Sequence, residues 1–590
     1  MRLILTFFIG LFSFFFLSEL VSRLFKIYLH NLLGVIFLLA GFFMGIWGNN
    51  LLPAPLDLLS SLFLYGAGVG LVGHHLLSKQ YIVSERLERN FVKRHETKFE
   101  RFLEMIPGIL TWVALTSPFW LSFTLPFAVA YLIIIADVYW LLNSLKIAVL
   151  IIVGYKKMEY AKKQPWLDNI KRDFPGEWDK YYHLILLPTY KEGLNVLTPA
   201  FDSVANSNFT KDKIFLCVGF EERTNPKEFH KQTIEHLDKL GKKIGVIKSF
   251  HPAGLPGEIP GPGTNRNWMV KTAVEEFKKR GIDPKDVLVT TLDADFVIHE
   301  NFLSGALHKY LSTPENLRLK RSYTGSFLYY NNYWQAPTPT RLIASGTAFW
   351  QLAEMVGSDK YQNFSSLSIN MQSILDVGGW IPNKVNDDSG FYWKAYFYFK
   401  GDYKVITHYM PLSGDTVLDV NLFKTFQNQY LQLKRWAYGV EHIPFIFKQY
   451  FRSPDIDFWD KTDKLVFVLW ANLKWGFLAL FVTFGGLLIP LVNPNYHASV
   501  LTVNLPIVSS WIMTIAFIGL FSTIYVHEKT VPKRPKEWSI ITRVWSYIQW
   551  LLVPIILVTI STLPAIDAQT SLMFGRYLEY RTTNKVRLTS

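Results

Sequence analysis

Long apolar stretches near both ends of the 590-residue chain flank a central region in which short apolar runs alternate with polar segments. Each long stretch has roughly the length that an α-helix needs to cross a bilayer. The predicted spans are 3–21, 32–48, 57–77, 107–125 and 127–153 before the central region, and 472–492, 500–526 and 545–564 after it. The pattern predicts about five helices in an N-terminal membrane region, 1–160, and about three in a C-terminal membrane region, 460–590.

The central region, 165–450, has the alternation of strands and helices that is typical of an α/β domain. Its short apolar runs predict strands at 183–187, 213–218, 244–247 and 287–290, with helix-like stretches between them. Such an order predicts a Rossmann-like, mostly parallel sheet that is covered on both faces. A Gly/Pro-dense segment, 252–263, can be neither helix nor strand. It is either a plain surface loop or a loop that wraps a ligand.

Composition and charge agree with a membrane protein. Half of the residues are apolar, only 18% are charged and the net charge is +14. Basic residues gather in the predicted loop 78–104 and again just after residue 155, so both segments are expected in the cytoplasm, together with the central domain. This predicts an integral protein of the plasma or inner membrane. The basic residues form no dedicated tail, so nucleic acid is not expected as a partner.

Two membrane features are left open by the sequence. Asp137 lies inside the apolar run Ile133–Trp140, where it is either a functional group or a carboxyl that is hydrogen-bonded to a neighbouring helix. Three C-terminal spans would put the tail outside, whereas its basic residues favour the inside. One span is therefore a candidate for a re-entrant or interfacial segment, with Pro554 and Pro564 as breaks. The single cysteine, Cys217, excludes an intrachain disulfide.

Candidate chemistry begins where the run Val287–Leu292 ends in Asp293-Ala294-Asp295. In open α/β sheets, ligands bind beyond the carboxyl ends of the strands. Two carboxylates one residue apart at such a place can share Mg²⁺ or Mn²⁺, which takes its other ligands from water and substrate phosphates. The alternative is a strand that ends in a polar turn, with one Asp capping the next helix.

A second candidate segment follows the first predicted strand, where Tyr190 can stack on a base and Glu192 can bond to it. A third is Asn386-Asp387-Asp388, which follows Gly378-Gly379-Trp380 and stands at the head of an aromatic helix. A carboxylate there is stabilised as an anion by the helix dipole, and it is either a general base or a simple N-cap.

A fourth segment, Gln432-Leu-Lys-Arg435-Trp436, follows an amphipathic stretch that is expected on the membrane face. Its amide, guanidinium and indole fall at i, i+3 and i+4, on one helix face. Arg435 can hold a pyrophosphate in bidentate fashion, and Trp436 offers a platform for a sugar ring. The alternative is an interfacial anchor, because Trp and Arg are enriched at membrane surfaces.

In this order the motifs resemble those of the membrane-embedded family 2 glycosyltransferases, which include cellulose, chitin and hyaluronan synthases. The resemblance covers about residues 180–440 and implies a GT-A-type domain inserted between bundles of transmembrane helices. It implies that Asp293 contacts the nucleotide diphosphate and, with Asp295, the metal. It further implies that Asp388 is the general base and that the acceptor end and the pyrophosphate are bound by Gln432, Arg435 and Trp436.

The sequence departs from that pattern at three places. Asn386-Asp387-Asp388 replaces a Thr-Glu-Asp motif, so Asp387 competes with Asp388 for the role of base. The usual Asp pair after the second strand is missing, and Glu221 or Glu222 must hold the nucleotide instead. Arg266 stands near the place of a usual lysine and is expected to contact the donor nucleotide.

The function that the resemblance implies is the transfer of a sugar from a nucleotide sugar, first of all a UDP-sugar, to a growing polysaccharide. Transfer would invert the anomeric centre, depend on Mg²⁺ or Mn²⁺, and be coupled to export across the membrane. Two alternatives stand beside it. One is the transfer of a single sugar to a lipid carrier. The other is a non-enzymatic transporter or scaffold that carries a degenerate sugar-nucleotide domain.

Overall fold

The computed structural model describes residues 93–357, 360–362, 364–498, 500–583 and 586–587, together with the isolated positions Ala40 and Leu64. The chain divides into two compact units. One unit comprises Met1–Leu103 and Ile443–Phe467. The other comprises Glu104–His442 and Val468–Ser590, and it holds the central domain with most of the apolar helices. The predicted spans 3–21, 32–48 and 57–77 lie outside the described residues.

The central domain is built on one mixed sheet of eight strands in the order β3-β2-β1-β4-β7-β6-β8-β5. The strands are β1 Tyr182–Pro188, β2 Ile214–Glu221, β3 Gly245–His251, β4 Val287–Thr291, β5 Val297–Ile298, β6 Arg321–Leu328, β7 Ser368–Asn370 and β8 Lys404–Ser413. β3, β2, β1 and β4 are parallel to one another. The other half is mixed, because β7 is antiparallel to both β4 and β6, whereas β6 is parallel to β8.

Helices cover both faces of the parallel half. α8 (Leu194–Ala205), α10 (Lys231–Leu240) and α12 (Phe302–Leu311) share one hydrophobic core with alternate residues of β1 and β2, such as Ile185 and Leu216. α11 (Pro262–Lys279) packs on the opposite face, where the buried Cys217 approaches Met269. The four predicted strands are therefore confirmed, and the sheet is mixed rather than parallel throughout. The Gly/Pro segment is irregular through Gly261, as predicted, but its last two residues, Pro262 and Gly263, begin α11, because proline fits the first turn of a helix.

The domain also has the short helices α7 Trp166–Asp173, α9 Pro226–Phe229 and α13 Glu315–Arg318, and four further helices of the domain follow later in the chain. They are α14 Thr338–Gly357, α15 Met371–Val377, α16 Asp387–Tyr398 and α17 Leu422–Ala437. α16 begins at Asp387 and α17 carries Gln432, Arg435 and Trp436, so both helix predictions are confirmed. The residues that open α17 leave an apolar surface, because Leu422 and Phe423 are exposed.

Five helices among the described residues are long and apolar enough to cross a membrane: Lys98–Thr124, Pro126–Lys162, Phe458–Leu487, Val500–Thr530 and Ile540–Met573. The helices that form these stretches are α5 Lys93–Thr124, α6 Pro126–Lys162, α19 Phe458–Val492, α20 Val500–Ala516 and α21 Ile518–Thr530. The last stretch, beyond a loop, contains α22 Ile540–Ile548, α23 Val553–Ile556 and α24 Leu563–Met573. Residues 93–104, predicted as part of a basic loop, are instead the first turns of α5. Their Lys, Arg and Glu side chains favour helix, and Pro107 is the first proline inside it.

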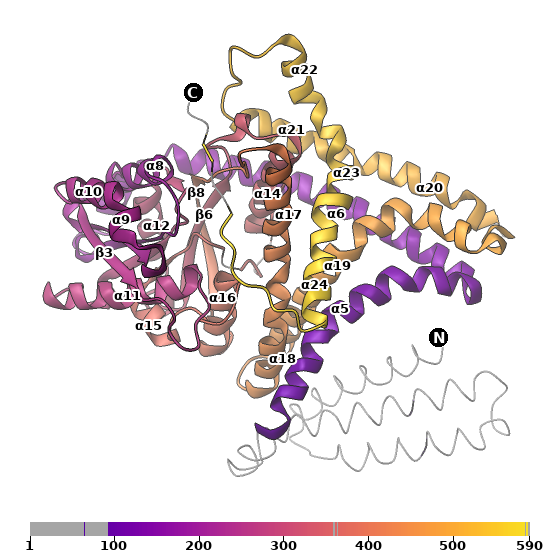
Figure 1. Ribbon diagram of the computed structural model, residues 1–590, viewed down its shortest axis with the longest axis horizontal. Coiled ribbons are helices and arrows are strands. Elements are labelled where there is room, and N and C mark those ends of the chain that lie inside the picture. Colours follow the sequence, from indigo (N-terminus) through magenta and orange to yellow (C-terminus); the bar gives the residue numbers. More distant parts are fainter. Residues whose placement is uncertain are drawn as a thin grey trace. The chain divides into compact units, whose positions relative to one another are not determined.

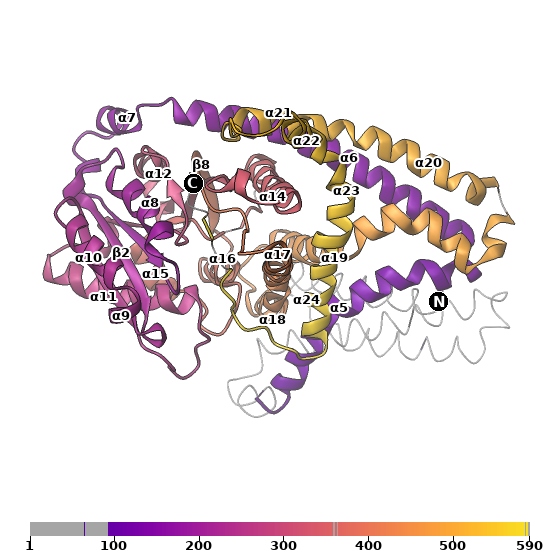
Figure 2. The same ribbon diagram turned by 45° about the horizontal axis from the view of Figure 1, so that its top comes forward.

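Asp137 of α6 is fully buried, and the hydroxyl of Ser509 on α20 donates a hydrogen bond to it. Of the two readings of Asp137, the structure shows the carboxyl that is bonded to a neighbouring helix. Figures 1 and 2 show α6 and α20 running side by side away from the sheet, whereas α23 and α24 run across their direction. After α24 the tail returns along the sheet domain and ends near β8 and α8.

Candidate active site

Arg266 is the centre of a cluster of charged side chains at the ends of the parallel strands. It lies in the first turns of α11, is fully buried, and reaches three carboxylates. Its Nη1 atom donates to Asp387 at 2.5 Å and to Asp388 at 2.9 Å. Its Nη2 atom donates to Asp293, after β4, at 3.3 Å. The sequence placed these four residues in three separate motifs, and the fold joins them through one guanidinium.

Close packing of α11 against α16 makes this cluster possible. A Cβ atom at Gly263 would lie 2.6 Å from the Cβ of Asp387, so no larger residue fits there. Trp380 lies on the other side, with its ring 6.0 Å from the Arg266 guanidinium. Arg266 is thus held by packing as well as by charge. It was expected to contact the donor, and the structure shows its guanidinium engaged with carboxylates of the chain itself.

Three carboxylates share one buried cation, and their protonation reflects this imbalance. Burial raises the pKa of Asp388 to about 8; Arg266 and Arg435 oppose the rise, and the charges of Asp387 and Asp293 add to it. Burial also raises the pKa of Asp387. The Asp388 side chain is 20% exposed, against 6% for Asp387. Asp388 is therefore the carboxyl that an incoming hydroxyl can reach more readily.

The turn that carries these two carboxylates is fixed from the end of α17. The Asn386 backbone N–H donates to the buried Glu441, and the Asn386 side chain donates to the Arg435 carbonyl, at 2.8 and 2.9 Å. The ring of His442 is 2.7 Å from the Asn386 carbonyl. Burial raises the pKa of Glu441 to about 7. The Asn-Asp-Asp and Gln-x-x-Arg-Trp segments thus form one connected structure.

α17 presents its three candidate residues to two different places. The Arg435 guanidinium lies 4.7 Å from the ring of Tyr580 in the tail, and it is close enough to the carboxylates to lower the pKa of Asp388. Its buried Nε atom has no hydrogen-bond partner among the described residues, as expected of a group able to take an anion. Gln432 and Trp436 instead line a small cavity of about 20 Å³, which has space for about one water molecule. Further lining residues are Tyr329, Ile343, Ala344, Thr347, Asp415, Thr416, Val417 and Gln429.

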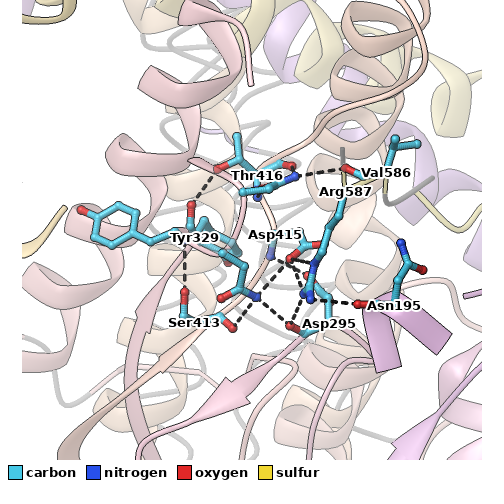
Figure 3. A network of polar contacts seen from close by, with 11 residues as sticks. Asn195, Asp295, Tyr329, Ser413, Asp415, Thr416, Val586 and Arg587 are labelled. Atoms are coloured by element: carbon cyan, nitrogen blue, oxygen red, sulfur yellow. Dashed lines mark hydrogen bonds and ion pairs between the residues drawn. The ribbon is translucent and has the colours of Figure 1, made fainter. Parts of the chain in front are cut away.

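The second residue of the Asp-x-Asp pair belongs to a different network, which Figure 3 shows. Asp295 is buried, and its Oδ2 atom accepts the Asp415 backbone N–H at 2.7 Å. Arg587, in the tail, donates to both oxygens of Asp415, and its Nη2 atom is 3.5 Å from the Asp295 carbonyl. It also donates to the Asn195 carbonyl at the start of α8. Asp293 and Asp295 are thus both at the site, each with a different arginine.

Four residues predicted to bind the nucleotide lie at the ends of β1 and β2. One face of the Tyr190 ring is covered by Arg223 at 4.1 Å. Glu192 accepts the Tyr190 backbone N–H and the Thr189 hydroxyl, at 2.7 and 2.9 Å, so its carboxylate shapes the turn. A cavity of about 420 Å³ adjoins this turn, between Glu192 and the segment Glu228–Thr233. Its size is within the range of small-molecule sites.

The side chains of Glu221 and Glu222 lie in opposite surroundings. Glu221 is buried, and its Oε2 atom lies 3.4 Å from His251 and 3.3 Å from Arg223. The other ring nitrogen of His251 contacts Glu258 of the Gly/Pro segment at 3.0 Å, which ties that segment to the end of β3. Glu222 is exposed. Of the two candidates, Glu221 is the one that belongs to a built polar cluster.

Asp415, Tyr580, His251 and Arg587 are site residues that the sequence reasoning missed. Arg587 was noted only as a charge of the tail, and Asp415 follows Gly414 in a turn with no recognisable motif. For a metal, the available ligands are hard carboxylate oxygens of Asp293 and Asp295, which suit Mg²⁺ or Mn²⁺. The described residues contain no group of three or more His, Cys, Asp or Glu side chains placed to hold a metal. A metal here would need water and phosphate oxygens as well.

No protein-family model and no curated protein matches this sequence. Among solved structures, a mannosyltransferase, PcManGT from Pyrobaculum calidifontis, in complex with GDP-Man and Mn2+, is 12% identical, with 73% of this chain and 100% of that chain covered and a TM-score of 0.35. S. aureus TarS 1–349 in complex with UDP-GlcNAc is 14% identical, with 67% and 93% covered and a TM-score of 0.32.

GalNAc-T7 with UDP, GalNAc and Mn2+ is 10% identical, with 49% of this chain and 57% of that chain covered and a TM-score of 0.28. These structural neighbours are glycosyltransferases. A TM-score below 0.5 does not establish a common fold, so the function rests on the residues of this chain.

Proposed function

We propose that this chain is a membrane-embedded glycosyltransferase whose GT-A-type domain faces the cytoplasm and takes a nucleotide sugar, first of all a UDP-sugar, as donor. One observation carries the proposal. Arg266 gathers Asp293, Asp387 and Asp388 at the strand ends, beside an arginine with an unpartnered nitrogen and a cavity with an indole. The acid–base and anion-binding groups thus meet at the strand ends, and the sugar-stacking indole of Trp436 is carried by the same helix as the anion-binding Arg435.

Asp388 is the general base in this proposal. It takes the proton of an acceptor hydroxyl while that oxygen forms a bond to the anomeric carbon and the bond from that carbon to the diphosphate breaks. The electron pair leaves with the nucleoside diphosphate, and a single displacement of this kind inverts the anomeric centre. A pKa raised to about 8 makes Asp388 a stronger base than an ordinary carboxylate. Asp387 is more deeply buried and serves as the partner of Arg266.

Arg435 is the group proposed to stabilise the departing diphosphate, because a guanidinium binds phosphate oxygens in bidentate fashion. Asp293 and Asp295 would hold Mg²⁺ or Mn²⁺, which supplies positive charge at the diphosphate when it is bound. On the nucleotide side, Tyr190, Glu192 and Glu221 border the space beyond β1 and β2. Activity that survives EDTA unchanged would remove the metal from this proposal.

The acceptor is proposed to be a growing polysaccharide whose terminal sugar lies on Trp436. The cavity that Trp436 lines is also bordered by α14, and α14 packs closely on the apolar helix α6, where a Cβ at Gly154 would meet Leu352 at 2.6 Å. A sugar stacked on Trp436 would therefore be next to the helices through which a polymer would leave. Transfer to a lipid carrier is the alternative, and its product is a single-sugar lipid.

A donor screen tests the proposal directly. Membranes that contain the protein are given a panel of nucleotide sugars with Mg²⁺ or Mn²⁺, and the release of nucleoside diphosphate and the products are measured. We expect release from one donor and a polymer as product, both lost in Asp388→Asn. A single-sugar lipid as the product with every donor would replace the polymerase by the lipid-carrier transferase. Release from no donor at all would support the non-enzymatic scaffold.

A further inference from the structure

The segment between α21 and the tail begins and ends on the same side of the protein, at the sheet domain. At its beginning, the Thr530 hydroxyl is 3.0 Å from that of Tyr330, and the Trp334 indole donates to the Pro532 carbonyl at 2.7 Å. Just after its end, the ring of Tyr580 lies 4.7 Å from the Arg435 guanidinium of α17, and further on Arg587 is paired with Asp415. A helix that crosses a bilayer separates its ends by about 30 Å of hydrocarbon. Residues 531–576 therefore leave the sheet domain and come back to it.

The shape of this segment agrees with a path along the surface of a membrane. Pro554 and Pro564 stand at the starts of α23 and α24, and a π-helical stretch, Leu557–Thr562, lies between these helices. α23 and α24 run across the direction of α6 and α20 (Figures 1 and 2). α24 is bound to the sheet domain, since Asp567 accepts from Tyr430 at 3.0 Å and pairs with Lys434 at 2.9 Å.

The outer surface of α22 and the loop before it is both apolar and basic. Ile540 and Ile541 are each 81% exposed and Leu551 is 68% exposed. Lys533, Lys536 and Arg543 are also exposed. Arg543 donates to the Lys536 carbonyl at 2.8 Å, which keeps the basic loop beside the helix. Apolar side chains next to lysines and arginines are the composition of helices that lie in the headgroup layer of a membrane.

The inner surface of the same loop is anchored firmly. The Arg341 guanidinium, on α14, lies 5.5 and 5.8 Å from the rings of Trp334 and Trp538, which contact each other edge to face at 5.1 Å. The Trp545 indole donates to Thr338 at 3.1 Å. Both contacts attach the segment to α14, which borders the acceptor cavity. The apolar and basic surface is thus a fixed part of the sheet domain.

We propose that residues 533–551 lie flat in the headgroup layer on the catalytic side of the membrane and bind anionic phospholipid headgroups through Lys533, Lys536 and Arg543. This inference rests on the membrane placement in the proposed function. It leaves two crossings after the catalytic domain, α19 and α20–α21, and returns the tail to the catalytic side. The basic residues of the tail are then on the side that the charge rule prefers.

Labelling of single cysteines tests the path of the chain. Cys217 is the only cysteine and is buried, so it does not compete for a polar maleimide. We expect Lys536→Cys and Glu579→Cys to react from the same side of sealed vesicles as Lys243→Cys in the catalytic domain. Asn495→Cys, in the turn between α19 and α20, should react only after permeabilisation. Glu579→Cys reacting only together with Asn495→Cys would overturn the inference.

The lipid is tested by native mass spectrometry of the protein purified from an equal mixture of phosphatidylglycerol and phosphatidylcholine. A basic residue near an anionic surface strengthens binding by about fivefold. The variant with Lys533→Gln, Lys536→Gln and Arg543→Gln should therefore lose at least about tenfold of the preference for phosphatidylglycerol. A control with Lys242→Gln, Lys243→Gln and Lys278→Gln should keep it. If the wild type shows no preference for phosphatidylglycerol, or if the triple variant retains that preference, the proposed lipid-binding site is wrong.

These outcomes separate the inference from the proposed function. If Asn495→Cys and Lys243→Cys react together in sealed vesicles, the membrane placement is wrong and the inference falls with it. If they react from opposite sides and donor turnover is normal, but Glu579→Cys follows Asn495→Cys, the proposed function stands and only the path of residues 531–576 is wrong.

Discussion

Two arginines hold carboxylates at the strand ends of this protein, and they come from opposite kinds of structure. Arg266 is part of α11, has a fully buried side chain, and binds three carboxylates. Arg587 is among the last residues of the chain, has a side chain that is 16% exposed, and pairs with Asp415 alone. The first cation is fixed by the packing of two helices. The second is held by the few contacts of a tail.

The different attachment of the two arginines indicates which parts of the site can change during a reaction cycle. Removal of Arg266 would leave Asp293, Asp387 and Asp388 around a buried space without their cation, and such a change is costly. Removal of Arg587 would leave a single carboxylate, Asp415, whose side chain is 3% exposed, and the irregular tail that carries Arg587 can move away from it, unlike α11. We therefore expect the Arg266 cluster to be a permanent framework, and the Arg587 contact to be one that substrate can displace.

The largest effect is expected for Arg266→Gln. Breaking a buried ion pair by removal of one partner typically costs about 3–5 kcal/mol, and here three carboxylates lose their partner. We expect a large fall in the thermal midpoint of the purified protein and no donor turnover. Arg266→Lys keeps the charge but loses the forked set of hydrogen-bond donors, so its thermal midpoint should lie between those of the wild type and Arg266→Gln. A normal midpoint in Arg266→Gln would mean that the cluster is not a framework.

The second largest effect is expected to distinguish the roles of Asp388 and Asp387. Loss of a general base costs about 10²–10⁴-fold in rate. We expect Asp388→Asn to lose that much in kcat with donor affinity little changed, and Asp387→Asn to lose less activity and more stability. The measurement is steady-state release of nucleoside diphosphate, with thermal unfolding in parallel. If Asp387→Asn is the slower enzyme, the assignment of the base is off by one residue.

The pH dependence of kcat/KM should report the ionisation of Asp388. Only deprotonated Asp388 accepts a proton, so kcat/KM should rise with pH, about tenfold per unit, and level off above about pH 8. Stability should change in the opposite direction. The pKa is raised from 3.8 to about 8 in the folded protein, so folding favours the protonated form, and its contribution is lost as pH rises through that range. A profile that is flat between pH 6 and pH 9 would exclude Asp388 as the base.

A smaller effect is expected at the cavity that borders the tail network. Trp436→Ala should keep donor hydrolysis and give shorter product chains, because stacking on an aromatic face contributes about 1 kcal/mol, or about fivefold in acceptor binding. Product length on a gel is the readout. Trp511→Ala, an exposed indole on α20, is the matched control. Equal elongation by both variants would remove Trp436 from the acceptor site.

The smallest loss of stability is expected for Arg587→Gln. The Asp415 side chain is only 3% exposed, but the introduced amide can still donate to it, so the loss should be about 1–3 kcal/mol and the fall in the thermal midpoint smaller than for Arg266→Gln. A double-mutant cycle with Asp415→Asn measures the coupling of the two side chains. A coupling energy as large as the loss in Arg266→Gln would show that the tail is as firmly part of the framework as α11 is, and the contrast between the two arginines would disappear.

Patterns of neighbouring residues in the sequence were sufficient to predict the local helices and strands and the residue types of the site. Alternating and continuous apolar runs predicted the first four strands, and helix-start signals predicted the beginning of α16, because these rules depend on neighbours along the chain. They also located Asp293, Asp388 and Arg435 as charged groups at the ends of elements.

The tertiary structure alone decided which of these groups meet. Arg266 is 121 residues from Asp387, and Arg587 is 172 residues from Asp415 and 292 from Asp295. No periodicity or cap relates such distant positions, so only the packing of α11 on α16 and the return of the tail could join them. The same reason explains why Gln432 and Trp436 line the cavity while Arg435, on the same helix, faces Tyr580. It also underlies the proposal that the chain around Ile540–Met573, apolar enough to cross a membrane, returns to the side from which it started.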